Sequence, residues 1–461
     1  MALLLLLTGT FAWTSISQRA TNTVDLANNP GGRVHDDFNT STVESDGTAN
    51  KDIYAENFGE MDIFVRIKLS EYLEVDGMKI AGGDKDDKST WAPYVLGANA
   101  EARNYVTWEM GGDKIFLPTF NTEIDGNLDE SFMTDASGNA IDDISGGVTA
   151  LGDGSHDYFV DGQAYANPNG GSQTNTAKST IIEDGTVMTM ADWVTANYPT
   201  GNFWVIDTDG WAYWANPLAA GEATSLLLNE LNFSTSALEA EEMHYAIDVI
   251  GEFATRADLT RFSDGSSAHG NASYNGMILF NTAAGGIPTK AGEKFADADG
   301  TGVVWRVLNP NDGKGNALII TEHVHIVGQK YNYANEYTTF ESSLLNSSMQ
   351  SWYKNTANVG DTLRNMGLNY ADIDNSASEG KALALSLDEI NSYIGNTNVN
   401  PNTKLIAKDV NGTPRTWWTR TQVPNNNDYP VYIIHAEGRV FASLANTEGT
   451  TGMRPALWVK R

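Results

Sequence analysis

The feature that most constrains this chain is a set of short segments in which apolar residues occupy every second position. From position 63 to 69 the odd positions are all aliphatic, namely Ile63, Val65, Ile67 and Leu69, and the even positions hold Phe64, Arg66 and Lys68. A period of two residues is that of a β-strand with one buried face. The connections over 76–200 are long and rich in Gly, Asp, Asn and Thr. Asp209-Gly210 between the aromatic segments 203–207 and 211–214 predicts a hairpin. The first half therefore predicts a β-sandwich or jelly roll that carries insertions.

The pattern changes past position 276, where strand-like segments alternate with helical ones. Segments 303–308 and 317–327 are expected as strands, and 342–353 and 387–393 as helices. Ser386 followed by Glu389 is a helix N-cap pattern. The chain ends in further strand-like segments near 415–420, 430–434, 438–444 and 455–459. This half is predicted to be an α+β domain.

Length sets the number of domains. A chain of 461 residues is too long for one ordinary core, so two or three domains are expected. Residues 261–276 are small and polar without periodicity, which is typical of a linker. We therefore predict a β-rich region over 13–260, a linker over 261–276 and the α+β domain over 277–461.

Residues 1–12 indicate a secreted or cell-surface protein. The stretch from Ala2 to Leu7 is apolar, and the small residue Ala12 stands near a plausible cleavage point. These residues have no basic start, so we interpret them as a signal-peptide remnant, with a first core strand as the alternative. So short an apolar segment cannot span a bilayer.

Charge and cysteine content exclude several classes of function. The formal net charge of −30 repels nucleic acid phosphates and anionic lipid headgroups, so we expect no nucleic acid partner. The chain has no cysteine, which excludes disulfides, cysteine nucleophiles and thiolate metal sites. An acidic surface suits a protein that stays soluble outside the cell, and calcium is the one cofactor that we consider.

Catalytic motifs are missing from the sequence. It has no Gly-x-Ser-x-Gly elbow, no phosphate-binding loop and no His-Glu-x-x-His pair. His323 and His325 flank Val324, so they are either two ligands of a zinc ion or two half-buried strand histidines. We favour strand histidines because no third ligand stands nearby in the sequence. We predict that the chain is not an enzyme, and a metalloprotease is the enzymatic alternative.

Asp297 and Asp299 open the one segment that is similar to a calcium loop. The sequence from 297 to 302 reads Asp-Ala-Asp-Gly-Thr-Gly, which places oxygen ligands at alternate positions. An EF-hand would need Glu at its twelfth position, where this chain has Leu308. The segment is therefore either a calcium site of another kind or a turn before the next strand.

Three motifs in the first 75 residues point to one family. The apolar leader ends in Gly-Thr-Phe-Ala-Trp (9–13), residues 22–26 read Asn-Thr-Val-Asp-Leu, and Glu56–Gly59 precedes the strand at 64–69. Together they resemble the N-terminal region of camelysin and TasA-like biofilm-fibre proteins. The resemblance implies a jelly-roll domain at the cell envelope. As an alternative function it implies a matrix fibre that assembles by strand exchange through residues 13–30.

Residues 277–461 carry a second resemblance, to C-type-lectin-like domains. Its motif residues are Trp417, Trp418, Arg420, Gly452 and Arg454. They are similar to the formylglycine-generating-enzyme branch of that fold, which also supplies the variable proteins of diversity-generating retroelements. Formylglycine chemistry needs cysteines, so the resemblance implies the fold and not that activity. We expect a structural role for Arg454.

In such variable proteins the ligand-contacting residues lie between the Trp-rich strand and the terminal Gly-x-Arg. The alternation through 432–443 predicts one face on which Tyr, Ser and Asn bind an extracellular protein or glycan. The alternative is a plain solvated hairpin. The candidate residues are Asn425, Asn426, Asn427, Asp428, Tyr429, Tyr432, His435, Glu437, Arg439, Phe441, Ser443 and Asn446.

Overall fold

The computed structural model describes residues 20–23, 32–38, 47–57, 61–97, 99–111, 164–166, 172–174, 186–220, 222–336, 338–374, 380–447 and 449–461. The segment 1–12, which is expected to be a signal-peptide remnant, lies outside the described residues. The chain is β-rich: 34% of it is strand, arranged in several sheets, and 20% is helix. It divides into two compact units, one of residues 1–193 and 200–276 and one of residues 194–199 and 277–461.

The N-terminal unit contains a large sheet built around two long antiparallel strands, β4 (Ile63–Val75) and β14 (Met243–Thr255). The sheet continues on one side to β1 (Ala20–Thr23) and on the other to β12 (Trp211–Trp214), β11 (Trp204–Ile206) and β10 (Val187–Thr189). Two short strands also pair with β4, namely β5 (Met78–Ala81) and β6 (Ala92–Pro93). The expected hairpin over 203–214 is present as β11 and β12, with the Asp-Gly turn between them.

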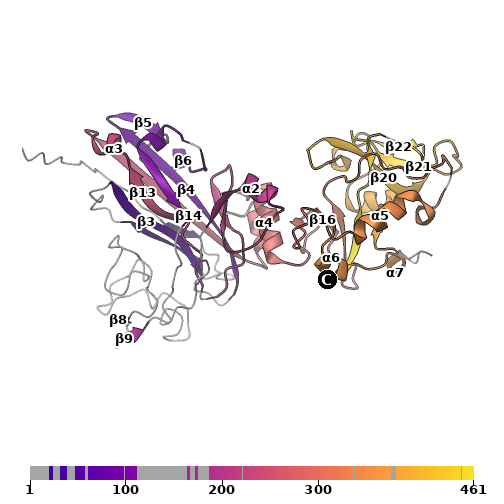
Figure 1. Cartoon of the computed structure of the whole chain (residues 1–461), viewed down its shortest axis with the longest axis horizontal. Coiled ribbons are helices and arrows are strands. Elements are labelled where there is room, and N and C mark those ends of the chain that lie inside the picture. Colours follow the sequence, from indigo (N-terminus) through magenta and orange to yellow (C-terminus); the bar gives the residue numbers. More distant parts are fainter. Residues whose placement is uncertain are drawn as a thin grey trace, which may run out of the picture. The chain divides into compact units, whose positions relative to one another are not determined.

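A second sheet covers one face of the first (Figure 1). Its strands, in order, are β2 (Gly32–Phe38), β3 (Thr48–Asn57), β13 (Leu228–Phe233) and β7 (Val106–Met110). Ile53 and Leu231 of this sheet share one apolar core with Val65 and Val249 of the large sheet. The remaining described elements are α2 (Met190–Thr195), α3 (Thr235–Leu238), β8 (Ala164–Ala166), β9 (Ser172–Thr174) and 3₁₀ helices at Lys88–Thr90, Ala102–Asn104 and Leu259–Phe262.

The other face of β4, which carries Arg66, is buried as well, and the period of two residues alone does not predict this. Arg66 is fully buried, and its guanidinium lies 4.0 Å from the ring centroid of Trp211 and 4.7 Å from that of Phe262. It forms an ion pair with Glu252, which is 2% exposed. Cation–π contacts and a charge partner allow a guanidinium to be buried.

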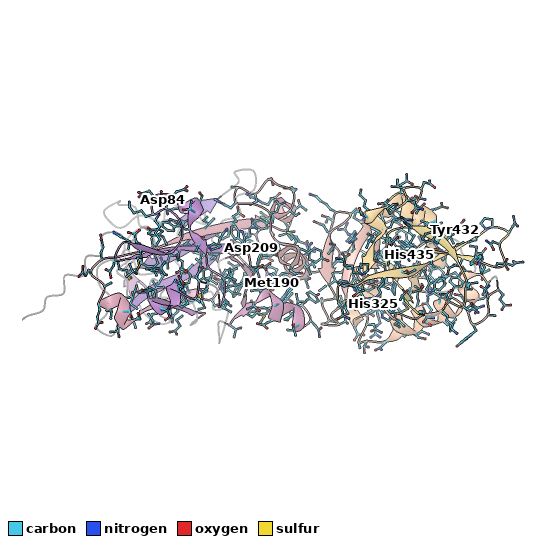
Figure 2. The ribbon with its side chains drawn as sticks, turned by 90° about the horizontal axis from the view of Figure 1, so that it is seen from above. Asp84, Met190, Asp209, His325, Tyr432 and His435 are labelled. Atoms are coloured by element: carbon cyan, nitrogen blue, oxygen red, sulfur yellow. The ribbon has the colours of Figure 1, made fainter. Side chains whose placement is uncertain are left out.

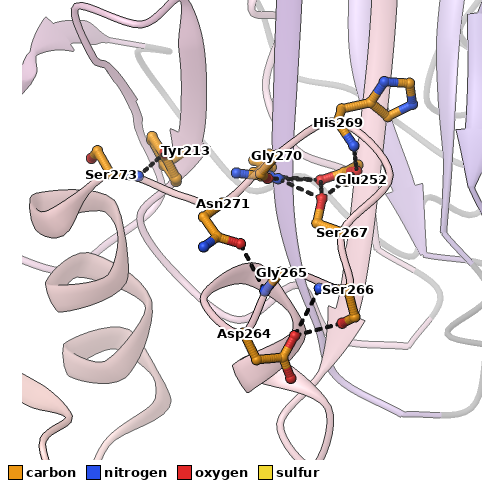
Figure 3. Close-up of polar contacts among 11 residues, drawn as sticks. Tyr213, Glu252, Asp264, Gly265, Ser266, Ser267, His269, Gly270, Asn271 and Ser273 are labelled. Carbon is orange, nitrogen blue, oxygen red and sulfur yellow. Dashed lines mark hydrogen bonds and ion pairs between the residues drawn. The ribbon is translucent and has the colours of Figure 1, made fainter.

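The segment that covers this face is 261–276, the expected linker. Ser267 donates to Glu252 (2.8 Å) and accepts from Arg66 (3.0 Å), while the backbone N–H of His269 also donates to Glu252 (3.3 Å). Figure 3 shows Ser267 and this N–H converging on the carboxylate, with the His269 ring turned away. The segment is thus an ordered part of the N-terminal unit rather than a free connection.

The described residues of the C-terminal part form two sheets, five α-helices and two 3₁₀ helices, the latter at Phe340–Ser342 and Thr403–Leu405. One sheet has the order β15 (Lys294–Ala296), β16 (Val304–Asn309), β17 (Asn316–Thr321), β24 (Ala456–Lys460) and β18 (Ala382–Leu383). The other has the order β19 (Ala407–Lys408), β20 (Pro414–Gln422), β21 (Val431–Ile434) and β22 (Val440–Ser443), with β23 (Thr451–Gly452) parallel to β20.

The helices of the C-terminal part are α4 (Tyr274–Ala284), α5 (Leu344–Lys354), α6 (Asp361–Met366), α7 (Ala371–Asp374) and α8 (Leu387–Tyr393). Ser386 caps α8 together with Glu389, as the sequence predicts. The strand expected over 317–327 is shorter, because β17 ends at Thr321. Across the described residues, the helices are all too short or too polar to cross a membrane.

Candidate binding surface

The candidate surface stands on a frame of buried tryptophans in β20. Trp417 and Trp418 are both fully buried although they are adjacent in one strand, so both faces of β20 are covered. The indole N–H of Trp417 donates to the Leu405 carbonyl (3.2 Å), and that of Trp418 donates to the Gln329 carbonyl (2.6 Å). Each ring therefore has its polar atom satisfied, which fixes the position of the strand.

Gly452 and Arg454 complete the frame. Gly452 pairs in parallel with Trp417, and a Cβ atom there would lie 2.5 Å from Val324 Cγ1, so the close approach requires glycine. The guanidinium of Arg454 lies 5.2 Å from the Trp417 ring centroid, and its Nε donates to the Thr321 carbonyl (2.9 Å). These contacts make Arg454 a structural residue.

Arg420 connects the frame to helix α8. Its Nη2 lies 2.8 Å from Oε1 of Glu389, the same residue that completes the α8 capping box. The pair is partly buried and therefore less screened than a surface ion pair. All five motif residues thus lie in the support of the surface.

The loop from 423 to 430 is held by its own hydrogen bonds. The side-chain oxygen of Asn426 accepts from the N–H groups of Asp428 (3.1 Å) and Tyr429 (2.8 Å), which is an Asx turn. Asn425 has a left-handed φ of 56°, which Asn tolerates better than most residues. Asn427 is exposed, and the Tyr429 side chain remains 49% exposed. The loop therefore presents Tyr429 from a fixed backbone.

The turn between β21 and β22 carries a second group of candidates, which we call the hairpin tip: His435, Glu437, Arg439 and Phe441. The His435 N–H donates to the Arg439 carbonyl (2.7 Å), and Gly438 closes the turn with a φ of 78°. The His435 ring meets Phe441 edge-on at 5.6 Å, and Arg439 Nε lies 3.5 Å from Glu437. Phe441 is 42% exposed, which is high for a phenylalanine.

The twelve candidates do not share one face, which corrects the sequence-based prediction. Residues that pair directly across two strands point to the same side. Tyr432 pairs with Ala442, and Ile433 pairs with Phe441, so Tyr432 and Phe441 lie on opposite faces. Ser443 is only 8% exposed, and Asn446 is half-buried. The sequence-based prediction continued the alternation of side chains from β21 through the turn into β22. Because the chain reverses in the turn, the pairing register of the two strands decides which side chains share a face. Figure 2 labels Tyr432 and His435 in this unit.

A loop outside the predicted interval joins this surface. The Asn335 side chain donates to the Asp428 carbonyl (2.9 Å) and accepts from the Ala445 N–H (2.9 Å), and the Asn332 N–H donates to the Ala445 carbonyl (2.9 Å). These bonds join the chain neighbours of three exposed side chains, Tyr333, Tyr429 and Leu444. We call them the aromatic rim.

Tyr333 is 75% exposed and was missed from the sequence. Residues 331–336 read Tyr-Asn-Tyr-Ala-Asn-Glu, a Tyr- and Asn-rich composition of the kind that binding loops use. That composition was a usable signal. Tyr331 itself is buried, and its ring centroid lies 5.7 Å from that of Trp418. The same short segment therefore supplies one residue that packs on the frame and one that is exposed at the surface.

The histidine pair lies elsewhere in the unit, after the end of β17. The His325 ring packs 5.3 Å from that of Trp352, and burial, with His323 and Arg454 adding to the effect, lowers the pKa of His325 to about 4. The pKa of His323 is also lowered by burial. Among the described residues no cluster of three His, Asp or Glu is arranged to hold a metal ion. The zinc interpretation of this pair gains no support from these contacts.

Asp297 and Asp299 accept hydrogen bonds from the start of α6. Asp297 accepts from the Gly360 N–H (2.8 Å), and Asp299 accepts from the Thr362 N–H (2.7 Å). Burial raises the pKa of Asp297, although the N–H groups of Gly360 and Asp299, which donate to its carboxylate, oppose the rise. The two carboxylates therefore act as a remote helix cap, and the calcium assignment stays a prediction.

Comparisons of the chain with protein-family models, with curated proteins and with solved structures find no match.

Proposed function

We propose that this is a secreted or cell-surface bacterial protein whose C-terminal unit binds an extracellular protein or glycan. In this proposal the N-terminal unit is a jelly roll of the camelysin and TasA kind that displays or anchors the binding unit. The C-terminal unit is a C-type-lectin-like domain, and the protein has no catalytic step. The proposal rests on the two sequence resemblances and on the geometry of the surface.

The observation that carries the proposal is the exposure of large apolar side chains on a rigid support. The aromatic rim and the hairpin tip expose Tyr333, Tyr429 and Phe441, while the frame beneath them is fully buried. Rigid aromatic side chains bind ligands well because little conformational entropy is lost on binding. Neighbouring Asn side chains supply hydrogen bonds of adaptable geometry.

The test is a screen of the full chain against glycan arrays and displayed protein libraries. Replacing Tyr333 and Tyr429 together by Ala should weaken any selected ligand by about tenfold or more, since each tyrosine is a potential binding anchor. Tyr393→Ala is the matched control, because Tyr393 is an exposed tyrosine of α8 in the same unit. If the folded protein binds nothing in either screen, the result would count against the proposed binding function.

A narrower form of the proposal is that this surface is diversified by a retroelement. Glu437, Arg439 and Phe441 are exposed, so their replacement leaves the frame intact. Sibling genes that differ mainly within 421–446, next to a template repeat and a reverse transcriptase gene, would support it. Siblings that vary evenly along the chain would contradict it.

A fibre subunit is the second candidate, and strand β1 favours it. β1 pairs in parallel with β14 at the edge of the large sheet, from Ala20 opposite Val249 to Thr23 opposite Glu252. A short strand from one end of the chain, held at a sheet edge, is a segment that two copies can exchange. The fibre proposal requires concentration-dependent filaments that disappear when residues 13–30 are deleted.

A further inference from the structure

We propose that the free edge of strand β22 binds an extended polypeptide, which adds to the sheet as a further strand. The inference rests on the proposed binding function and assigns a ligand class to it. β22 is the last strand of its sheet and pairs only with β21 among the described residues. It contains Phe441 of the hairpin tip and is followed by Leu444 of the aromatic rim, so the edge belongs to the candidate surface.

The hydrogen-bond parity of the hairpin identifies the open backbone groups. Bonded and non-bonded residue pairs alternate along an antiparallel ladder. The His435 N–H donates to the Arg439 carbonyl, so that pair is bonded, and the pairs of Ile434 with Val440 and of Tyr432 with Ala442 are non-bonded. The N–H and C=O groups of Val440 and Ala442 therefore point away from β21.

An independent contact supports this parity. The Tyr432 carbonyl accepts a hydrogen bond from the Thr419 hydroxyl of β20 (2.7 Å). Tyr432 therefore directs its carbonyl toward β20 and away from β22, as a member of a non-bonded pair must. Its partner Ala442 consequently has its own backbone groups on the outer edge.

The edge lacks the usual protection against pairing. Natural edge strands carry charged residues, proline or bulges that block another strand, whereas β22 reads Val-Phe-Ala-Ser. Phe441 is exposed on one face of this strand and Ala442 on the other. The charged residues Glu437 and Arg439 stand before the strand and not within it.

This chemistry fits a polypeptide better than a glycan. The outer edge offers a donor and an acceptor from every second residue, a repeat that an extended peptide backbone matches. The exposed Phe441 ring then supplies an apolar contact for alternate side chains of the added strand. Sugar hydroxyls have no such repeat, so a glycan would bind the aromatic rim instead of the edge.

The test uses proline at a position where the fold does not need the N–H. Ala442→Pro removes one outward donor and places a ring on the edge, while the bonds between β21 and β22 remain. Ala442→Val is the control, because it keeps the N–H and favours a strand. The probes are synthetic peptides selected by panning a phage-displayed library of random linear peptides on the full chain.

The expected result is a loss of affinity of about tenfold or more in Ala442→Pro, against a change of about twofold or less in Ala442→Val. Amide hydrogen exchange at Val440 and Ala442 should also slow when the peptide is added. Peptides that bind both variants equally would overturn the inference. A dimer of the free protein that Ala442→Pro abolishes would also overturn it, since the edge would then pair with a second copy.

The outcomes separate this inference from the proposed function. A glycan or a folded protein that loses affinity in the Tyr333 and Tyr429 variant, but not in Ala442→Pro, would preserve the binding function and refute strand addition. An unchanged thermal unfolding midpoint of Ala442→Pro, compared with Ala442→Val, would show that the loss of binding does not come from unfolding.

Discussion

Replacing Glu252 by Ala should destabilise the N-terminal unit strongly. The change leaves the Arg66 guanidinium buried between Trp211 and Phe262 with only Ser267 and a backbone carbonyl as acceptors. Arg66 and Glu252 are 0% and 2% exposed, so water cannot compensate for the lost charge. Breaking a buried pair from one side costs about 3–5 kcal/mol, a large share of the stability of an ordinary domain.

Urea unfolding measures this cost. With an m value of about 2 kcal/mol/M, the midpoint of the N-terminal transition should fall by about 1.5–2.5 M. Trypsin cleavage after Arg261 measures the local release of the segment that follows, because this segment is hydrogen-bonded to Glu252. The double variant Arg66→Met with Glu252→Leu should cost much less, since apolar replacement of both partners leaves no uncompensated charge. A single-variant cost of about 1 kcal/mol or less would refute the reasoning.

Three further predictions concern the C-terminal unit. Gly452→Ala should lower its stability by about 1–3 kcal/mol in thermal unfolding, because the new Cβ would lie 2.5 Å from Val324 Cγ1. His325 has a pKa of about 4 when folded against 6.5 when unfolded. The contribution of the neutral imidazole to the free energy of unfolding, about 3 kcal/mol at most, is therefore complete above pH 6.5 and is lost as the pH falls toward 4. His325→Leu should flatten that part of the stability–pH curve. Asp299→Ala should lower the free energy of unfolding by about 1 kcal/mol, because the Thr362 N–H loses its acceptor. If capping is the whole role of this aspartate, millimolar calcium should leave the melting temperature of the unaltered protein unchanged.

The sequence predicted the elements whose signal is local. The period of two over 63–69, the Asp-Gly turn before Trp211 and the capping pair of Ser386 and Glu389 each depend on neighbours within a few residues. The structure has β4, the hairpin of β11 and β12, and α8 at these places. The β-rich character of the chain follows from the same short-range patterns.

The sequence failed where a distant segment decides the environment. Arg66 alternates with aliphatic residues, and it is buried by Trp211 of β12 together with the returning residues 261–270. A polar, aperiodic segment such as this one has the composition of a linker whether it is free or bonded. The partner of Arg66, Glu252, is far along the chain, so no local window contains the information.

The candidate site was predicted in part for the same reason. The interval after the Trp-rich strand does contain Tyr429 and the hairpin tip, but Tyr333 comes from a loop that reaches them through Asn335. Ser443 follows the alternation and is nevertheless buried. Whether a strand residue is exposed depends on the register with its partner strand, which a single sequence does not encode directly.

The separation of frame and surface decides which positions in this unit can change without loss of the fold. Asn426 supports the surface as the frame residues do, because its side chain holds the loop that presents Tyr429. Glu437 and Arg439 contact each other at the tip and are both exposed, so their contribution to stability is small. Phe441 is exposed as well, and its burial by a ligand would be favourable. A binding surface that evolves quickly should therefore vary at the tip and keep Asn426 and Ser443, although all five residues fall in the same short interval of sequence.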